Sequence, residues 1–310
     1  MIEVKNLTKD YGHRRAINKL NFSVKKGEVV GFLGPNGAGK STTMKIITGF
    51  MAPSSGTASI AGFDVFENPL EVKKRIGYLP EIPPVYSDMY VADYLRYVAA
   101  LKKVPKDQIE LNVKYAIEKT NLGDVQGRLI HHLSKGFKQR VGIAQALVSN
   151  PEVLILDEPT VGLDPKQVAE IRELIKSLRG EHTVILSTHI LPEVEATCEK
   201  VIIINKGEIV AEDNIQNLSL IERGQSRLFM RVRGKVDLHS LKNEFDFIQT
   251  IATGNNESEW ELALTGGEES IEKIASFVVN KGWGLRELSP AKMDLEDVFL
   301  KLTYDRVEEK

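Results

Sequence analysis

The chain has 310 residues, 42% of them apolar and 27% charged, as expected for a globular protein of one large domain or two ordinary ones. Its formal net charge of −2 gives no whole-chain electrostatic argument for binding nucleic acid or anionic lipid. The single cysteine, Cys198, excludes an internal disulfide and is expected to be buried as a small apolar residue. No apolar run approaches the roughly 20 residues needed to cross a bilayer, and the first residues lack a signal-peptide layout. We therefore expect a cytosolic chain whose membrane role, if any, comes through a partner.

The N-terminal residues predict strands followed by a strand–loop–helix unit. Residues 1–24 alternate short apolar stretches with turn residues, which favours antiparallel strands. Residues 29–33 are a compact apolar strand, and a helix begins at Ser41. Residues 34–41 between them read GPNGAGKS and fit the phosphate-loop pattern G-x-x-x-x-G-K-[ST] at every fixed position. In such a loop backbone N–H groups wrap a β-phosphate, Lys40 reaches the β- and γ-phosphates, and the Ser41 hydroxyl binds Mg²⁺. A glycine-rich turn with a chance lysine is the alternative, which the flanking strand and helix disfavour.

The middle of the chain reads as helices followed by buried parallel strands. Apolar residues at three- and four-residue spacing predict helices over 91–103 and 107–121, and Ser134 can cap a third helix that runs to Ser149. Compact apolar runs at 153–157 and 183–188 are typical of buried parallel strands. Residues 201–204 and 209–211 then predict a hairpin around Asn205-Lys206-Gly207.

A polar stretch at about 217–226 predicts a domain boundary. We expect a first domain over residues 1–217, with a helical subdomain at about 85–150, and an accessory α+β domain over 218–310. The pattern after the boundary is a β-α-β-β-α-β order, typical of a ferredoxin-like unit, with a last helix. The expected elements are strands 227–233, 247–252, 259–264 and 284–288, and helices 237–244, 268–281 and 295–302. Trp260 and Trp283 in this segment are expected to be core residues rather than a ligand cage.

Two carboxylates end the apolar strand at 153–157. A strand ending in an acidic pair is common, but after a phosphate loop the chemistry of phosphoryl transfer demands such a pair. Asp157 would hold the Mg²⁺ shell, through water or through Ser41. Glu158 points in a different direction and would polarise the attacking water as a general base.

Residues 133–140, LSKGFKQR, complete a set of motifs, and with them the chain resembles the ATP-binding subunits of ABC transporters over residues 1–215. Six motifs occur in the order of that family. The resemblance implies an α/β P-loop cassette with antiparallel β and helical subdomains. It also implies two subunits packed head to tail, so that the phosphate loop of one and the signature helix of the other hold each ATP.

The resemblance assigns further roles to individual residues. Tyr11 matches the aromatic that stacks on adenine, Gly162-Leu163-Asp164 the loop that joins the two subunits, and His189 the histidine that contacts the γ-phosphate. Glu158 and His189 are then the expected catalytic residues, and Ser41, Glu81 and Asp157 the expected Mg²⁺ ligands. The expected ATP contacts are Tyr11, Gly34, Pro35, Asn36, Gly37, Ala38, Gly39, Lys40, Ser41, Thr42, Ser134, Gly136, Gln139 and Asp164.

The chain departs from the family pattern at two motifs. Lys135 and Phe137 stand where the signature usually has glycine and glutamine, while Ser134 and Gly136, which have the phosphate role, are retained. Glu81, in GYLPE, stands where most relatives carry a glutamine that touches Mg²⁺ and relays to the membrane subunit. A carboxylate still binds a hard cation, although it adds negative charge near the γ-phosphate. Glu81 as a solvated loop residue is the alternative.

Three features together resemble the export-type branch of the family, which includes gliding-motility and multidrug-export ATPases. They are GYLPE at 77–81, the LSKGF signature at 133–137 and the segment 295–303. The implied partners are integral membrane permease subunits and a second cassette, identical or paralogous, at the cytoplasmic face of the membrane, with no nucleic acid. Tyr94, Leu95, Tyr97 and Val98, with the loop 81–90, are either a docking surface for the permease or internal packing. The accessory domain could serve dimerisation, docking or small-molecule sensing.

Two other functional classes remain as alternatives. One is a soluble ABC ATPase that acts on ribosomes or DNA. Such relatives carry two cassettes or a long coiled-coil insertion, and this chain has one cassette and no basic arm. The other is a nucleotide-binding regulator without turnover, which the presence of both Glu158 and His189 disfavours.

Overall fold

The computed structural model describes residues 1–215, 226–233, 241–242, 244–253, 259–264 and 268–290. They form two compact units, the first up to Ile215 and the second from residue 226 onwards. Each unit has its own apolar core. The boundary expected near residue 217, and the helix expected at 295–302, lie outside the described residues.

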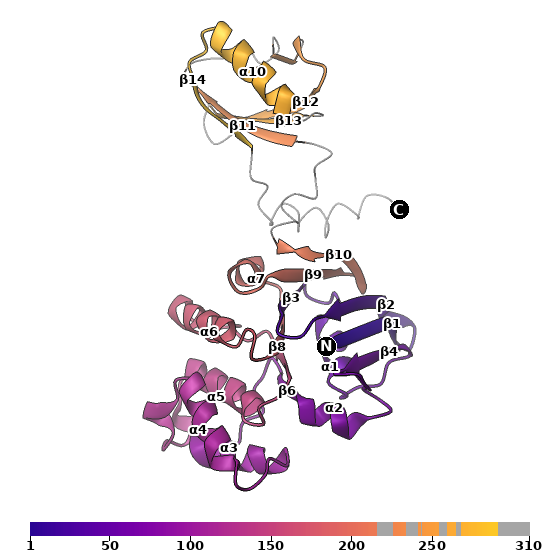
Figure 1. The fold of residues 1–310 in the computed structure, drawn as a ribbon, viewed down its shortest axis with the longest axis vertical. Helices are drawn as coiled ribbons and strands as arrows, with labels where there is room; N and C mark the ends of the chain where they lie inside the picture. Colours follow the sequence, from indigo (N-terminus) through magenta and orange to yellow (C-terminus); the bar gives the residue numbers. More distant parts are fainter. Residues whose placement is uncertain (216–225, 234–240, 243, 254–258, 265–267, 291–310) are drawn as a thin grey trace. The chain divides into compact units, whose positions relative to one another are not determined.

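A six-stranded, mostly parallel sheet is the centre of the first unit (Figure 1). Its order is β10-β9-β3-β8-β7-β6, and β3, β7 and β8 are buried at every position because helices and the second sheet cover both faces. These three strands confirm the three compact apolar runs. The bounds are β3 Val29–Leu33, β6 Ile76–Leu79, β7 Val153–Asp157, β8 Thr183–Thr188, β9 Lys200–Asn205 and β10 Glu208–Asn214.

The second sheet is antiparallel, in the order β2-β1-β4-β5, and confirms the strands expected before residue 24. Its strands are β1 Ile2–Tyr11, β2 Arg14–Val24, β4 Ser55–Ile60 and β5 Phe63–Asp64. Inward-facing residues such as Ile2, Leu20 and Ile60 join Phe32 and Met44 in one core. Apolar burial from two sheets and α1 thus supports the segment between β3 and α1.

Seven α-helices are described in the first unit, and α3, α4 and α5 form a group on the opposite side from β1, β2 and β4 (Figure 1). The two helices expected from apolar spacing and the one expected after Ser134 are confirmed, each within about two residues at its ends. Ser134 caps α5 as expected, because its hydroxyl accepts a hydrogen bond from Phe137 N–H. The bounds are α1 Lys40–Ile47, α2 Pro69–Arg75, α3 Val91–Leu101, α4 Ile109–Lys119, α5 Lys135–Leu147, α6 Pro165–Ser177 and α7 Leu191–Thr197.

The second unit has the strand order of a ferredoxin-like fold. β12-β13-β11-β14 pair antiparallel throughout, so the first and third strands of the motif lie in the centre. α10 packs Ile274 and Val278 against one face, and Trp260 and Trp283 pack against the same core, as expected. Of the helix expected at 237–244, only residues 241, 242 and 244 are described. The bounds are β11 Ser226–Val232, β12 Ile248–Thr253, β13 Glu259–Leu264, α10 Glu268–Asn280 and β14 Leu285–Pro290.

Two further expectations concern single features. Cys198 is buried, as expected, at the residue that follows α7, and burial raises the pKa of its thiol. No helix among the described residues is both long and apolar enough to cross a membrane.

His182 at the start of β8 predicts acid sensitivity of the fold. The imidazole is buried, Nδ1–H donates to Pro151 O at 2.6 Å, and Nε2 has no partner among the described residues. Burial lowers the pKa of His182, because a charged ring would place an unpartnered N–H in the core. Since the pKa in the folded state lies below the unfolded value of about 6.5, stability is fully present above that pH and is lost as pH falls through the folded pKa.

We expect the urea midpoint of unfolding to fall between pH 8 and pH 5 by more in the wild type than in His182→Asn. Asparagine keeps a donor for Pro151 but does not titrate. Equal pH slopes for the two proteins would contradict the assignment.

Candidate functional site

The segment from Gly34 to Gly39 joins β3 to α1, and within it Ala38 N–H donates to Pro35 O at 3.2 Å. Gly39, the residue before α1, has φ +112°, and a Cβ there would lie 2.9 Å from Ala16 O. No side chain caps the first N–H groups of α1, whereas side chains do cap α5 and α6. A helix N-terminus with uncapped N–H groups attracts anions, so this segment fits a phosphate.

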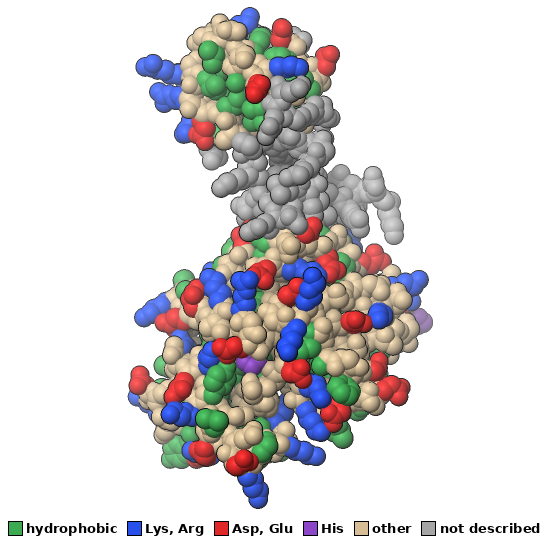
Figure 2. Space-filling model, in the orientation of Figure 1, with side chains coloured by type: hydrophobic (Ala, Val, Ile, Leu, Met, Phe, Trp, Pro, Cys, Tyr) green, Lys and Arg blue, Asp and Glu red, His purple; other side chains and the backbone are tan. Residues whose placement is uncertain are grey.

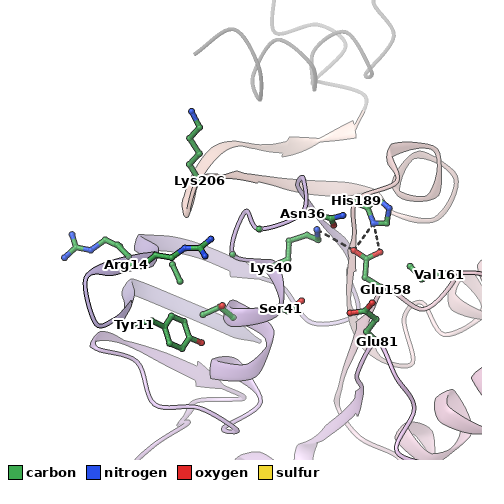
Figure 3. Close-up of a pocket in the computed structure, with 15 residues that line it drawn as sticks. Tyr11, Arg14, Asn36, Lys40, Ser41, Glu81, Glu158, Val161, His189 and Lys206 are labelled. Carbon is green, nitrogen blue, oxygen red and sulfur yellow. Dashed lines mark hydrogen bonds and ion pairs between the residues drawn. The ribbon is translucent and has the colours of Figure 1, made fainter. Parts of the chain in front are cut away.

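Lys40, Glu158 and His189 converge beside this loop, from three different elements (Figure 3). Lys40 Nζ donates to Gly34 O at 2.8 Å and lies 3.5 Å from Glu158 Oε1. His189 Nδ1 lies 3.0 Å from both carboxylate oxygens of Glu158. The Lys40 and Glu158 side chains are 6% and 8% exposed, while that of His189 is 40% exposed. The carboxylate is thus held between a buried cation and an imidazole that reaches solvent.

The backbone at Glu158 is unusual and directs its side chain. β7 ends at Asp157, and Glu158 has φ +50°, in the left-handed region that few side-chain residues adopt. Its N–H donates to Ser187 O at 2.8 Å, which ties the residue to β8. The change of direction separates two adjacent carboxylates, so that Glu158 lines the pocket beside Lys40 and His189.

Asp157 is buried and faces β8 and the loop. Its carboxylate accepts a hydrogen bond from Ser187 Oγ at 2.7 Å. Burial raises the pKa of Asp157, hydrogen bonds from Ser187 and Ser41 oppose that rise, and the charges of Glu158 and Glu81 add to it. Ser41, Asp157 and Glu81 are hard oxygen donors, as Mg²⁺ requires. The described residues contain no group of three or more His, Cys, Asp or Glu that could hold a metal.

A pocket of about 760 Å³ collects these groups and reveals residues that the sequence analysis missed. Tyr11, 46% exposed, presents its ring at one end, with its hydroxyl 2.9 Å from Met51 Sδ. Arg14, at the start of β2, and Lys206, in the β9–β10 turn, add two cations that are far apart in sequence (Figure 3). Basic residues at or beside turns were the available signal, but only tertiary packing brings them to the loop. The pocket is lined by Tyr11, Arg14, Arg15, Ala16, Asn36, Gly37, Gly39, Lys40, Ser41, Thr42, Glu81, Glu158, Val161, His189 and Lys206.

The signature residues lie outside that pocket. Ser134 caps α5 and Gly136 lies in its first turn, where a Cβ would lie 2.6 Å from the Gln167 side chain in α6. Asp164 caps α6 by accepting a hydrogen bond from Gln167 N–H at 2.9 Å. Gln139 is buried in α5. Within one chain these four residues are therefore not brought to Lys40.

A second hollow, of about 500 Å³, lies between the α3 group and α2. Tyr94, Leu95 and Val98 of α3 are buried, while Tyr97 is 40% exposed. The Tyr97 ring lies 5.6 Å from that of Tyr86, centroid to centroid. Leu70 and Leu101 also line the hollow and are exposed, and charged side chains, among them Glu71 and Lys73, complete its lining. Three of the four residues weighed as a docking surface are thus internal packing.

Fold and site together define an α/β P-loop domain that binds a nucleoside triphosphate. The ABC transporter family model matches residues 17–161. The uncharacterised ABC transporter ATP-binding protein YxlF of Bacillus subtilis is 32% identical over 305 residues, which cover 98% of this chain and all of the relative. The bacitracin transport ATP-binding protein BcrA of Bacillus licheniformis is 33% identical over 312 residues, 97% of each chain. A dimeric post-hydrolysis state of the ATP-binding cassette MJ0796, bound to ADP and Pi, matches with a TM-score of 0.63 and 26% identity, over 69% of this chain and 99% of that one.

The chain belongs to the family of ABC transporter ATP-binding proteins. It is an ATP-binding and ATP-hydrolysing subunit, and ATP hydrolysis is coupled to transport. Transporter relatives that match over nearly the whole chain favour this function over a soluble ATPase acting on ribosomes or DNA. Because those matches extend well past residue 215, both units have counterparts in these relatives.

Proposed function

We propose that the pocket beside Lys40 hydrolyses ATP by positioning one water molecule against the γ-phosphate. The observation that carries the proposal is the buried contact of Lys40 and Glu158 beside uncapped α1 amides, with His189 bonded to the same carboxylate. Lys40 and the loop amides bind the phosphates and neutralise their charge. Glu158 accepts a proton from the water and orients it, and His189 holds that carboxylate in place. Tyr11 stacks on the adenine ring.

The proposed Mg²⁺ ligands are Ser41 and Asp157, with Glu81 nearby. When bound, the ion would neutralise charge on the phosphate oxygens. The hydrogen bonds from Ser187 and Ser41 keep the Asp157 carboxylate oriented, although burial and its acidic neighbours oppose its ionisation. Glu81 adds a second carboxylate at the pocket wall, and we propose that it approaches the ion rather than serving only as a solvated loop residue.

We propose that the site is completed by a second cassette, identical or paralogous, packed head to tail. Ser134, Gly136, Gln139 and Asp164 lie outside the pocket, and an α5 N-terminus on another copy would supply anion-binding amides across the interface. ATP binding then closes the pair and hydrolysis opens it. The post-hydrolysis relative is itself dimeric, which supports a two-subunit cycle.

The proposed partner in the membrane is a permease subunit, which docks at the hollow of about 500 Å³ that Tyr97 helps to line. This places the chain at the cytoplasmic face of the membrane and makes it part of an export-type transporter. Nucleic acid is not a proposed partner, and positive and negative side chains are interspersed over the face of the first unit in Figure 2. The relative BcrA is a bacitracin transport ATP-binding protein, so an antibiotic such as bacitracin is one candidate cargo.

Replacing the exposed aromatic tests the docking proposal. We expect Tyr97→Ala to weaken permease binding about 5- to 30-fold, since truncating an interface aromatic typically costs about 1–2 kcal/mol. The measurement is the amount of permease that copurifies with the tagged chain from detergent-solubilised membranes. Leu111→Ala, an exposed apolar residue on α4 outside the hollow, is the matched control. Undiminished copurification with Tyr97→Ala would place the permease elsewhere.

A further inference from the structure

We propose that Glu193 is a positioning residue that sets the geometry between Glu158 and His189. This inference rests on the proposed function, because it concerns the site in which those two residues act. Glu193 was not singled out by any sequence motif. Its carboxylate bridges the two chain segments that carry the reacting groups, and it is set back from the pocket.

The carboxylate is buried and bonded on both sides. Glu193, in the first turn of α7, is 2% exposed, and it accepts hydrogen bonds from Thr160 Oγ1 and from Thr188 Oγ1, the latter at 3.0 Å. Both threonines are buried. Within the described residues no Lys, Arg or His forms an ion pair with Glu193. Burying a carboxylate is costly unless hydrogen bonds satisfy it, so the two hydroxyl donors are what makes this position tenable.

Each threonine lies within two residues of a reacting group in the chain. Thr160 follows Glu158 by two residues and lies in the turn that leaves β7, while Thr188 directly precedes His189. Thr188 Oγ1 also accepts from Ile190 N–H at 3.1 Å, which holds the chain on both sides of His189. One carboxylate thus fixes the distance between two backbone segments. The 3.0 Å contact of His189 Nδ1 with Glu158 depends on that distance (Figure 3).

The helix that carries Glu193 is anchored independently of the pocket. Val194 is buried, and a Cβ on Gly31 in the middle of β3 would lie 2.5 Å from its side chain. α7 therefore sits directly on the sheet, and the Glu193 carboxylate projects from a fixed support. A fixed support allows the carboxylate to impose its spacing on the two loops rather than follow them.

The test separates turnover from binding in the full chain. We expect Glu193→Ala to lower kcat by about 10- to 100-fold, the effect of a misplacement of about 1 Å at a reacting group. The dissociation constant for ATP is expected to change less than about 3-fold, because Glu193 does not line the pocket. Glu193→Gln keeps the shape and one acceptor oxygen, so its kcat is expected between those of the wild type and Glu193→Ala. Glu195→Gln, an exposed carboxylate on the same helix, is the matched control and is expected to leave kcat unchanged.

A double-mutant cycle distinguishes positioning from a general loss of fold. In a His189→Ala background, Glu193→Ala is expected to lower kcat further by less than about 3-fold, because the geometry it maintains is already lost. If Glu193→Ala does not fold, Thr188→Val removes one donor while keeping the side-chain shape, and a fall in its kcat at unchanged ATP affinity is expected.

Three results would overturn the inference. They are an unchanged kcat in Glu193→Ala, an equal loss of kcat and ATP affinity, and an undiminished effect in the His189→Ala background. Failure of the proposed function itself would appear separately, as full turnover by Glu158→Gln.

Discussion

Glu158→Gln is expected to retain ATP binding and to lose nearly all turnover, with a fall in kcat of about 10²- to 10⁴-fold, the usual contribution of a general base. The amide has almost the same shape but cannot accept a proton from water at neutral pH. Removing the negative charge beside Lys40 also removes repulsion of the γ-phosphate, so bound ATP is expected to persist. The paired cassettes should then accumulate in the closed form.

Two measurements check this expectation. Phosphate release gives kcat, and size-exclusion chromatography with light scattering, with and without ATP, gives the association state. Glu152→Gln, at the exposed start of the same chain segment, is the control and is expected to turn over normally. Rapid hydrolysis by Glu158→Gln would remove Glu158 from the role of base.

Lys40→Ala is expected to weaken ATP binding by more than about 10-fold. The Lys40 side chain is 6% exposed, and its ammonium group bridges the carbonyl of Gly34 and the carboxylate of Glu158. Losing a charge-assisted phosphate contact costs about 1.5–3 kcal/mol, which is about 10- to 100-fold in affinity. The uncompensated charge on Glu158 would repel the phosphates and add to that loss.

Isothermal titration with ATP in the presence of Mg²⁺ measures the effect. Lys45→Ala removes a lysine from the exposed side of the same helix and should bind as the wild type does. An unchanged ATP affinity in Lys40→Ala would contradict the assignment of the loop.

The parts of the site that could be predicted are those in which chemistry dictates local spacing. A phosphate loop needs glycines, a lysine and a hydroxyl at set intervals. The apolar run 153–157 predicted a buried strand ending at Asp157, and β7 has those bounds. The second unit was equally readable, because period-2 alternation in β11 and β13 and helical spacing in α10 are strong signals.

What could not be predicted depends on contacts between distant parts of the chain. Lys206 reaches the pocket because the β9–β10 turn packs on the loop, where Gly207 N–H donates to Ala38 O at 2.9 Å and Asn18 N–H donates to Gly207 O. The burial of Tyr94 follows from how α3 packs, and apolar spacing does not say which side chains a helix leaves at its edge. The bounds of α6 were not predicted, although Asp164 and Pro165 are typical of a helix start.

The left-handed backbone at Glu158 is unfavourable for folding, although the proposed chemistry requires a glutamate there. Glycine adopts such a conformation without cost, while a residue with a side chain gives up roughly 1–2 kcal/mol. A chain optimised for folding alone would therefore favour glycine at position 158, and a more robust but inert protein would result. The contacts of Glu158 with its neighbours, and not its own backbone preference, hold it in this conformation. Selection for thermostability alone at position 158 is therefore expected to favour variants that have lost ATPase activity.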